Sequence, residues 1–177
     1  MHLKTFNEFR EKFPEFYDSV KAGHKDTKEK NHGGHGLDHD ITVAMIAVKL
    51  TVDERVGQKA WCSAMLHSTD RVVEAGDVLD TMTRYAHNLK HFFNQDEMSE
   101  IIEAAFRHSE LNQTDQGETQ IVLMDADRLA NMQSAVIIRA GQFKSEIQAL
   151  DFKYLKGQID PMSTYENPRN VLDSIRL

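Results

Sequence analysis

Histidine and carboxylate residues gather in three short clusters along the chain, each within or beside an apolar run with helical spacing. The clusters lie at residues 35–39 (HGLDH), 67–70 (HSTD) and 125–129 (DADRL). Imidazole nitrogens and carboxylate oxygens are the groups that bind hard or borderline divalent cations. Because separate helices can each present such groups to one helical core, the clusters predict a metal site shared by three helices.

The first two clusters each lie at one end of an apolar helical run. His35 and His39 are four residues apart, which places both on one side of a helix that begins near Leu37. His67 ends a second run, so its ring is expected to point partly into the core. Asp70 follows three residues later and shares that face if the helix continues so far. Taken singly, such histidines are more often hydrogen-bonded core residues or chance pairs than metal ligands.

The third cluster places carboxylates inside an apolar helical segment. Asp125 and Asp127 lie between Ile121 and Leu129, and carboxylates rarely occupy such positions unless they are paired or bind metal. Two residues apart on a helix, they cannot face the same way. The alternative is that Asp127 pairs with a nearby arginine, either Arg128 or Arg71.

Three other groups of histidines differ in their surroundings. His108 closes an apolar segment, where it would suit a phosphate contact or the role of general acid. His87 and His91 lie in a more polar helix and are expected at the surface. His24 and His32 fall in the polar loop, from which they could touch a substrate, and neither is chosen as a site residue.

The elements that must position these groups are helices. Apolar residues recur at helical spacing, and alternation with a period of two is nearly absent, which predicts an all-α, single-domain bundle. Residues 1–20 are expected to form two short helices divided near Pro14, followed by a flexible polar loop at 21–34. Residues 35–156 are expected to form the helical core with the metal site, and 157–177 an irregular C-terminal tail. Within the core, helical runs are expected near 37–48, 56–67, 79–89, 98–108, 121–143 and 145–156.

Composition narrows the class of protein. The 177 residues are 40% hydrophobic, which fits one folded domain. The formal net charge of -7 argues against nucleic acid as the main partner. Cys62 is the single cysteine, so no intrachain disulfide forms, and its apolar neighbours predict a buried thiol. No apolar run approaches the length of about 20 residues that spans a membrane, so we expect a cytoplasmic protein.

The order and context of the clusters resemble the HD-domain superfamily of metal-dependent phosphohydrolases, whose signature is H…HD…D on successive helices of an all-α fold. His39 is followed by a Val-Ala pair at 43–44, as is common after that family's first histidine. Residues 64–67 (AMLH) are similar to the apolar approach to its His-Asp pair. Residues 126–129 (ADRL) match the context of its last aspartate, and 105–109 (AFRHS) resemble a helix that ends in His-Ser beside its site.

This resemblance covers residues 33–131, over half the chain, and implies a function. His39, His67 and Asp127 would hold a divalent metal, with manganese, magnesium, iron, zinc and nickel all left open. The substrate would be a phosphomonoester or phosphodiester, with a nucleotide favoured. Residues 126–132 also resemble guanosine polyphosphate hydrolases of the stringent response, but the acidic pair of those enzymes is not evident here.

One position departs from the family. Ser68 stands where the family has the aspartate of its His-Asp pair, and a hydroxyl is a much weaker ligand than a carboxylate. Three outcomes are open. Asp70 substitutes for the missing ligand, the site holds one metal with fewer carboxylates, or the domain has lost catalysis and kept a pocket.

If the protein is active, the metal lowers the pKa of a water molecule and offsets phosphoryl charge. Asp70, or else Asp38, would orient that water, while phosphate would be bound or protonated by His35, His108 and Arg128. The substrate-binding candidates are His35, Asp38, Arg71 and Asp125. The competing hypotheses are an HD-like module that binds a nucleotide or a partner protein, and a plain helical scaffold. A homo-oligomer is left open.

Overall fold

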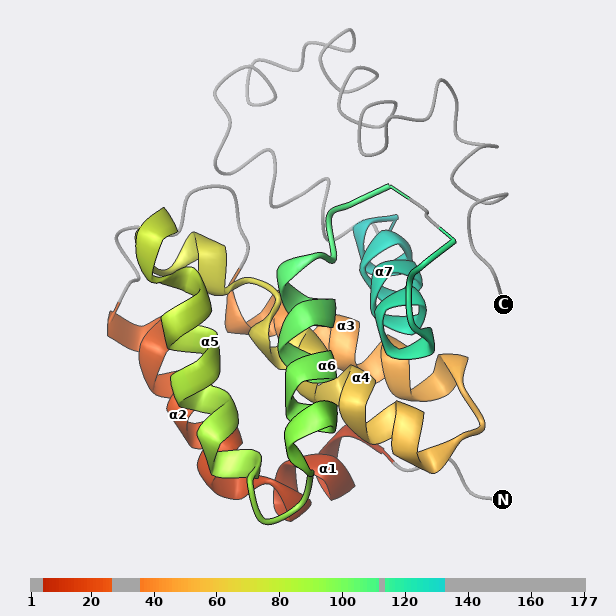
Figure 1. Cartoon of the computed structure of the whole chain (residues 1–177), viewed down its shortest axis with the longest axis horizontal. Helices are drawn as coiled ribbons and strands as arrows, with labels where there is room; N and C mark the ends of the chain where they lie inside the picture. Colours follow the sequence, from red (N-terminus) through yellow and green to blue (C-terminus); the bar gives the residue numbers. More distant parts are fainter. Residues whose placement is uncertain (1–4, 27–35, 112–113, 133–177) are drawn as a thin grey trace, which may run out of the picture.

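The computed structural model describes residues 5–26, 36–111 and 114–132. Every regular element in those ranges is helical, which confirms the predicted all-α class (Figure 1). The α-helices are α1 (Phe6–Lys12), α2 (Pro14–Asp26), α3 (Leu37–Leu50), α4 (Glu54–Leu66), α5 (Val78–Ala86), α6 (Gln95–Phe106) and α7 (Glu118–Asn131). Three short 3₁₀ helices join them, namely η1 (Thr69–Arg71), η2 (Ala75–Asp77) and η3 (His87–Leu89).

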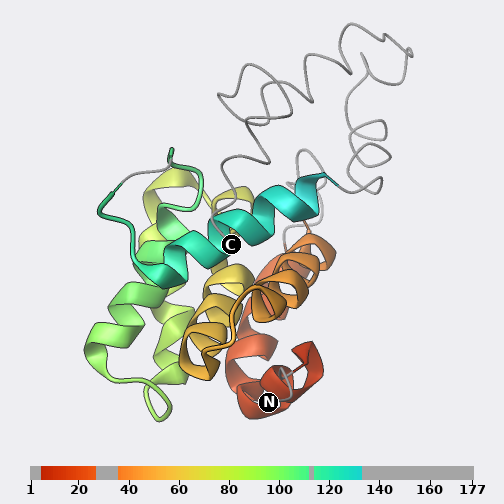
Figure 2. The same cartoon turned by 90° about the vertical axis from the view of Figure 1, so that its right-hand side faces the viewer.

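Helix α4 is the central element of the bundle. It packs against α3, α6 and α7, and α3 also packs along α7. The two views show α3 and α4 side by side, with α7 crossing them (Figures 1 and 2). Because α4 has neighbours on several sides, even its polar Ser63 is buried, and that hydroxyl donates to backbone carbonyls of α4 and α6. This arrangement brings the ends of α3, α4 and α7 together.

Local sequence signals explain where the helices begin. The carboxylate of Asp53 accepts two backbone N–H groups in the first turn of α4, as expected for an N-cap. Thr5 and Asn94 form capping boxes at the starts of α1 and α6. Pro14 is the first residue of α2, where its missing N–H removes no helical hydrogen bond. The predicted division of the N-terminal segment near Pro14 is therefore confirmed.

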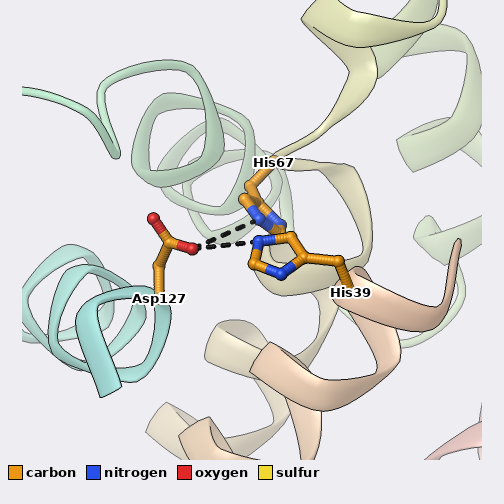
Figure 3. Close-up of side chains that lie close together, drawn as sticks. All are labelled: His39, His67 and Asp127. Atoms are coloured by element: carbon orange, nitrogen blue, oxygen red, sulfur yellow. Dashed lines mark hydrogen bonds and ion pairs between the residues drawn. The ribbon is translucent and has the colours of Figure 1, made fainter. Parts of the chain in front are cut away.

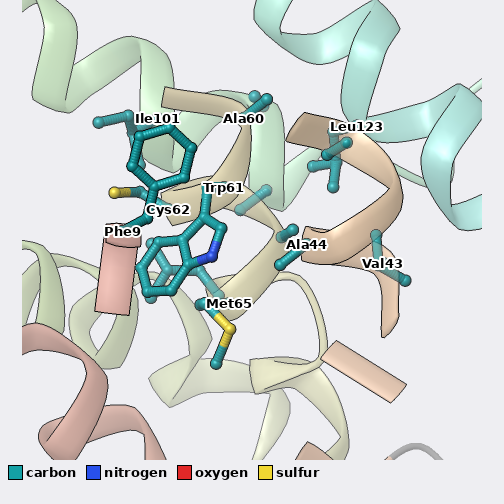
Figure 4. Close-up of a cluster of buried hydrophobic side chains, with 14 of the residues drawn as sticks. Phe9, Val43, Ala44, Ala60, Trp61, Cys62, Met65, Ile101 and Leu123 are labelled. Atoms are coloured by element: carbon teal, nitrogen blue, oxygen red, sulfur yellow. The ribbon is translucent and has the colours of Figure 1, made fainter. Parts of the chain in front are cut away.

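The hydrophobic core is built around Trp61 of α4 (Figure 4). The indole ring is fully buried, and aromatic rings from α1 and α2 lie around it, including those of Phe9, Phe13 and Phe16. The indole N–H has no hydrogen-bond partner within the described part of the chain. Cys62 beside it is buried as predicted, and burial raises the pKa of its thiol.

Two predicted boundaries differ from the structure. The prediction that a loop begins at residue 21 was wrong, because α2 continues to Asp26. Val20 is buried and His24 bonds to α3, so this polar stretch has contacts that favour helix. The helix expected at 79–89 ends as an α-helix at Ala86 and continues as η3.

Some expected segments fall outside the described residues. These are most of the 21–34 stretch, the part of the 121–143 helix beyond 132, the 145–156 helix and the C-terminal tail. No helix in the described ranges is both long and apolar enough to cross a lipid bilayer. His87 and His91 are exposed, which confirms the expectation that they lie at the surface.

Candidate metal centre

Side chains from three helix segments converge at one buried point (Figure 3). His39 lies in the first turn of α3, His67 directly follows α4, and Asp127 lies on α7. Asp127 Oδ1 is 3.1 Å from His39 Nε2 and 3.8 Å from His67 Nε2. The potential ligand atoms of all three residues lie within 4.8 Å of one another. The structure thus brings together the three residues that the sequence predicts as metal ligands.

The hydrogen bonding of His67 suits its Nε2 for a cation. Its Nδ1 lies 2.6 Å from the backbone carbonyl of Ala64, so we assign the ring proton to Nδ1. Nε2 then carries a lone pair that faces the carboxylate of Asp127 across 3.8 Å. Two such acceptors repel each other unless a cation lies between them. Ligand atoms that share an ion at about 2.0–2.2 Å are about 3–4 Å apart, so the donor set fits a metal.

The environment of Asp127 keeps its carboxyl group ionised. Burial raises the pKa of this group, but the hydrogen bond with His39 and the nearby His67 and His108 outweigh that effect. The net result holds the pKa of Asp127 well below its usual range. Asn131, one turn later on α7, also donates to Oδ1 at 3.2 Å. Asp127 therefore offers an anionic oxygen at neutral pH.

The alternative that Asp127 pairs with an arginine is not what the structure shows. Arg128 Nη1 lies 3.1 Å from Oδ1 of Asp125, which is fully buried. Arg71 Nε lies 3.3 Å from Asp70 in η1. Asp127 contacts His39 and His67 instead. The two aspartates of α7 face different partners, as their spacing predicts.

His108 lies beside the three-residue cluster. Its ring is nearly perpendicular to that of His67, with the ring centroids 5.1 Å apart. Its Nδ1 is 2.7 Å from the carbonyl of Ala105, so the ring proton is again assigned to Nδ1 and Nε2 carries the lone pair. Burial and the neighbouring His67 lower the pKa of His108, against the opposing charges of Asp127 and Asp70. The ring is therefore neutral near pH 7.

The residues that follow His67 divide between core and surface. Ser68 is buried, and its Oγ lies 3.4 Å from His67 Nε2, on the side that faces Asp127. Asp70 lies in η1 with a side chain 42% exposed, paired with Arg71. A 3₁₀ turn follows α4 instead of a continued α-helix, so Asp70 does not share the face of His67. The structure does not bring Asp70 into the cluster.

The remaining candidates for substrate binding lie at different depths. Asp38 is exposed on the first turn of α3, and Asp125 is buried and paired with Arg128. Arg71 is exposed beside Asp70, within the short η1 helix. His35 lies outside the described residues.

Two residues that the sequence analysis did not select also approach the cluster. Asp40 of α3 is fully buried, with Oδ1 3.5 Å from His67 Nδ1. His24 of α2 contacts the other oxygen of Asp40 at 2.8 Å. A signal for Asp40 exists in the sequence, because it is a carboxylate within the apolar run that follows His39. His24 gives no such signal, since it stands in a polar stretch.

Comparison of the chain with protein-family models, with curated proteins and with solved structures finds no match.

Proposed function

We propose that this protein is a metal-dependent phosphohydrolase that acts on a nucleotide or another small phosphoester. The observation that carries the proposal is the buried convergence of His39, His67 and Asp127, two imidazole nitrogens around one carboxylate oxygen. The resemblance of the same positions to the HD-domain signature supports the phosphoester substrate and an HD-type arrangement. The fold supports it through α3, α4 and α7, which each supply one ligand at a mutual junction.

The residues of the chain would divide the work as follows. His39, His67 and Asp127 would hold a divalent cation, which when bound supplies hydroxide near neutral pH and offsets phosphoryl charge. His108 has its Nδ1 bonded to a backbone carbonyl, so its Nε2 is the atom that would accept or return a proton. Its lowered pKa keeps that nitrogen unprotonated near pH 7. Arg128 would hold Asp125 behind the site.

A second candidate function rests on Ser68 and Asp70. With a serine in the position of the family's carboxylate and Asp70 exposed at the surface, the cluster has one anionic ligand. Such a site supports a domain that binds a nucleotide or a partner protein without hydrolysing it. The convergence of His39, His67 and the partly buried Asp127, whose side chain is 18% exposed, supports a metal site under both candidates, so turnover is what separates them.

Turnover on a panel of nucleotides and phosphoesters tests the proposal. The purified protein would be assayed with Mn²⁺ beside His67→Ala and Asp70→Ala, with Glu100→Gln as a control, because Glu100 contacts Lys59 and Thr119 and is not part of the cluster. We expect turnover by the wild type and by the control, and none by His67→Ala. Retained turnover in Asp70→Ala would show a site with fewer carboxylates, and its loss would give Asp70 a role in catalysis.

Absence of turnover on the whole panel, together with retained Mn²⁺ binding, would contradict the hydrolase. Gain of turnover by Ser68→Asp would then favour the binding module, because it would show that only the family's missing ligand separates this site from an active one.

A further inference from the structure

A buried carboxylate lies behind the metal centre, on the side of His67 away from Asp127. Asp40 is 0% exposed. Its Oδ2 lies 2.8 Å from His24 Nε2, and its Oδ1 lies 3.5 Å from His67 Nδ1. Within the described part of the chain, Oδ1 has no hydrogen-bond partner. A desolvated carboxylate oxygen in this state is costly, so an attractive charge nearby is needed to offset it.

The two ring nitrogens of His67 have different partners. Nε2 faces Asp127 Oδ1 at 3.8 Å, and Nδ1 faces the carbonyl of Ala64 with Asp40 just beyond. A cation on Nε2 would withdraw electron density from the ring and make the Nδ1–H a stronger donor. Carboxylates placed behind metal-binding histidines orient the ring and raise its basicity by this route.

The charges of the cluster also point to Asp40. His39 and His67 bind metal as neutral rings, so Asp127 supplies a single negative charge among the three ligands. Asp40 lies on the far side of His67 from Asp127, and the two carboxylates together would match the charge of a divalent cation. Because Asp40 and His67 are buried from water, that match counts for more than it would at the surface.

We propose that Asp40 is a positioning residue for the metal centre, which acts electrostatically on His67 from 3.5 Å and balances the charge of the cation, and that His24 anchors Asp40 from α2. This inference rests on the proposed metal site and adds an outer layer to it. It also assigns α2 a part in the site, although none of the three ligands lies on that helix.

Direct titration with Mn²⁺ or Co²⁺, followed by calorimetry and by the visible spectrum of Co²⁺, tests this role without an activity assay. Asp40→Asn keeps the shape of the side chain and removes its charge. We expect it to bind about 10–100-fold more weakly than the wild type at unchanged stoichiometry. Glu100→Gln, which removes a carboxylate from the Lys59 contact, is expected to bind like the wild type.

Variants of His24 test the anchor with Asp40 in place. His24→Ala removes the contact at Oδ2 and is expected to weaken metal binding, whereas His24→Gln presents a donor at a similar reach and should restore part of the affinity. This pair carries the test if Asp40→Asn does not fold. If the role of His24 is purely structural, His24→Ala should have lower thermal stability and unchanged metal affinity.

The outcomes separate this inference from the proposed function. No metal binding by the wild type would overturn both. Binding that is lost in His67→Ala but unchanged in Asp40→Asn and in His24→Ala would keep the metal site and overturn the role of Asp40. Weaker binding in Asp40→Asn or in His24→Ala, with Glu100→Gln unaffected, would support that role.

Discussion

Ser68 lies beside the candidate metal centre, in a position from which a second carboxylate would reach it. Its hydroxyl is buried and lies 3.4 Å from His67 Nε2, so a carboxylate at this position would reach the same side of the ring. Ser68→Asp is expected to strengthen metal binding, since an anionic oxygen is a better ligand for a divalent cation than a hydroxyl. Without metal the same change places an uncompensated charge in the interior, which destabilises by about 3 kcal/mol.

Thermal unfolding with and without Mn²⁺ checks this prediction. The expected result is a lower melting temperature in chelator and a larger rise with Mn²⁺ than in the wild type. Ser68→Asn is the matched control, because it has nearly the same size without the charge. Equal metal-induced rises in Ser68→Asp and Ser68→Asn would show that position 68 does not reach the cation.

At the scale of elements, the contact between α2 and α5 depends on a close approach. A Cβ atom at Gly23 would lie 2.0 Å from the hydroxyl oxygen of Tyr85. Gly23→Ala gains about 1 kcal/mol of helix propensity, yet the overlap must push Tyr85 or α2 aside. We expect the overlap to dominate, with a net loss of stability.

A double-mutant cycle with Tyr85→Phe measures this competition by chemical denaturation. Phe lacks the hydroxyl, and the next ring atom lies 3.1 Å from the added Cβ. The loss caused by Gly23→Ala should therefore shrink in the Tyr85→Phe background. Additive effects of the two changes would contradict a direct contact between residues 23 and 85.

The sequence predicts elements better than it predicts the surroundings of the site. Asp53 marks the start of α4 because an N-cap is a local signal, and Asp127 stands out as a carboxylate in an apolar run. The position of Asp70 depends on whether α4 continues past His67. It does not, and in the 3₁₀ helix η1 the side chain of Asp70 points toward solvent. His24 approaches Asp40 only through packing of α2 near α3, which no local pattern encodes.

At the scale of the whole molecule, an ion pair between α4 and α6 makes stability depend on pH. The guanidinium of Arg55 donates to both carboxylate oxygens of Glu97 at 2.6 Å and lowers the pKa of Glu97 to about 2. Because the folded-state pKa lies below the unfolded value, the stabilisation is complete above the unfolded pKa and disappears as the pH falls toward 2.

Glu97→Gln isolates this contribution, since glutamine can still accept in the capping box at Asn94. We expect the wild type to melt at a higher temperature than Glu97→Gln above pH 5, and the two to converge as the pH is lowered through the range from about 4.5 to about 2. The gap should be modest because the Arg55 side chain is 41% exposed. If the difference in melting temperature stays constant over this range, the Arg55–Glu97 ion pair is not the source of the pH dependence.

Metal binding should stabilise the entire bundle, because the three ligands tie α3, α4 and α7 together at one point. A ligand at about 100 times its dissociation constant stabilises the folded state by about 2.7 kcal/mol. For a domain of this size, that corresponds to a rise of about 5–10 °C in melting temperature. Fluorescence of Trp61, the single and fully buried tryptophan, reports the transition directly.

The control for this prediction is Asp127→Asn, which keeps the size of the ligand and removes its charge. Mn²⁺ should raise the melting temperature of the wild type, a chelator should reverse the rise, and neither should affect Asp127→Asn. A similar rise in both proteins would place the stabilising ion elsewhere on the acidic surface, because a charge of -7 attracts cations without a built site. If Mn²⁺ raises the melting temperature of neither protein, the proposed metal centre is contradicted, together with the chemistry proposed for His39, His67 and Asp127.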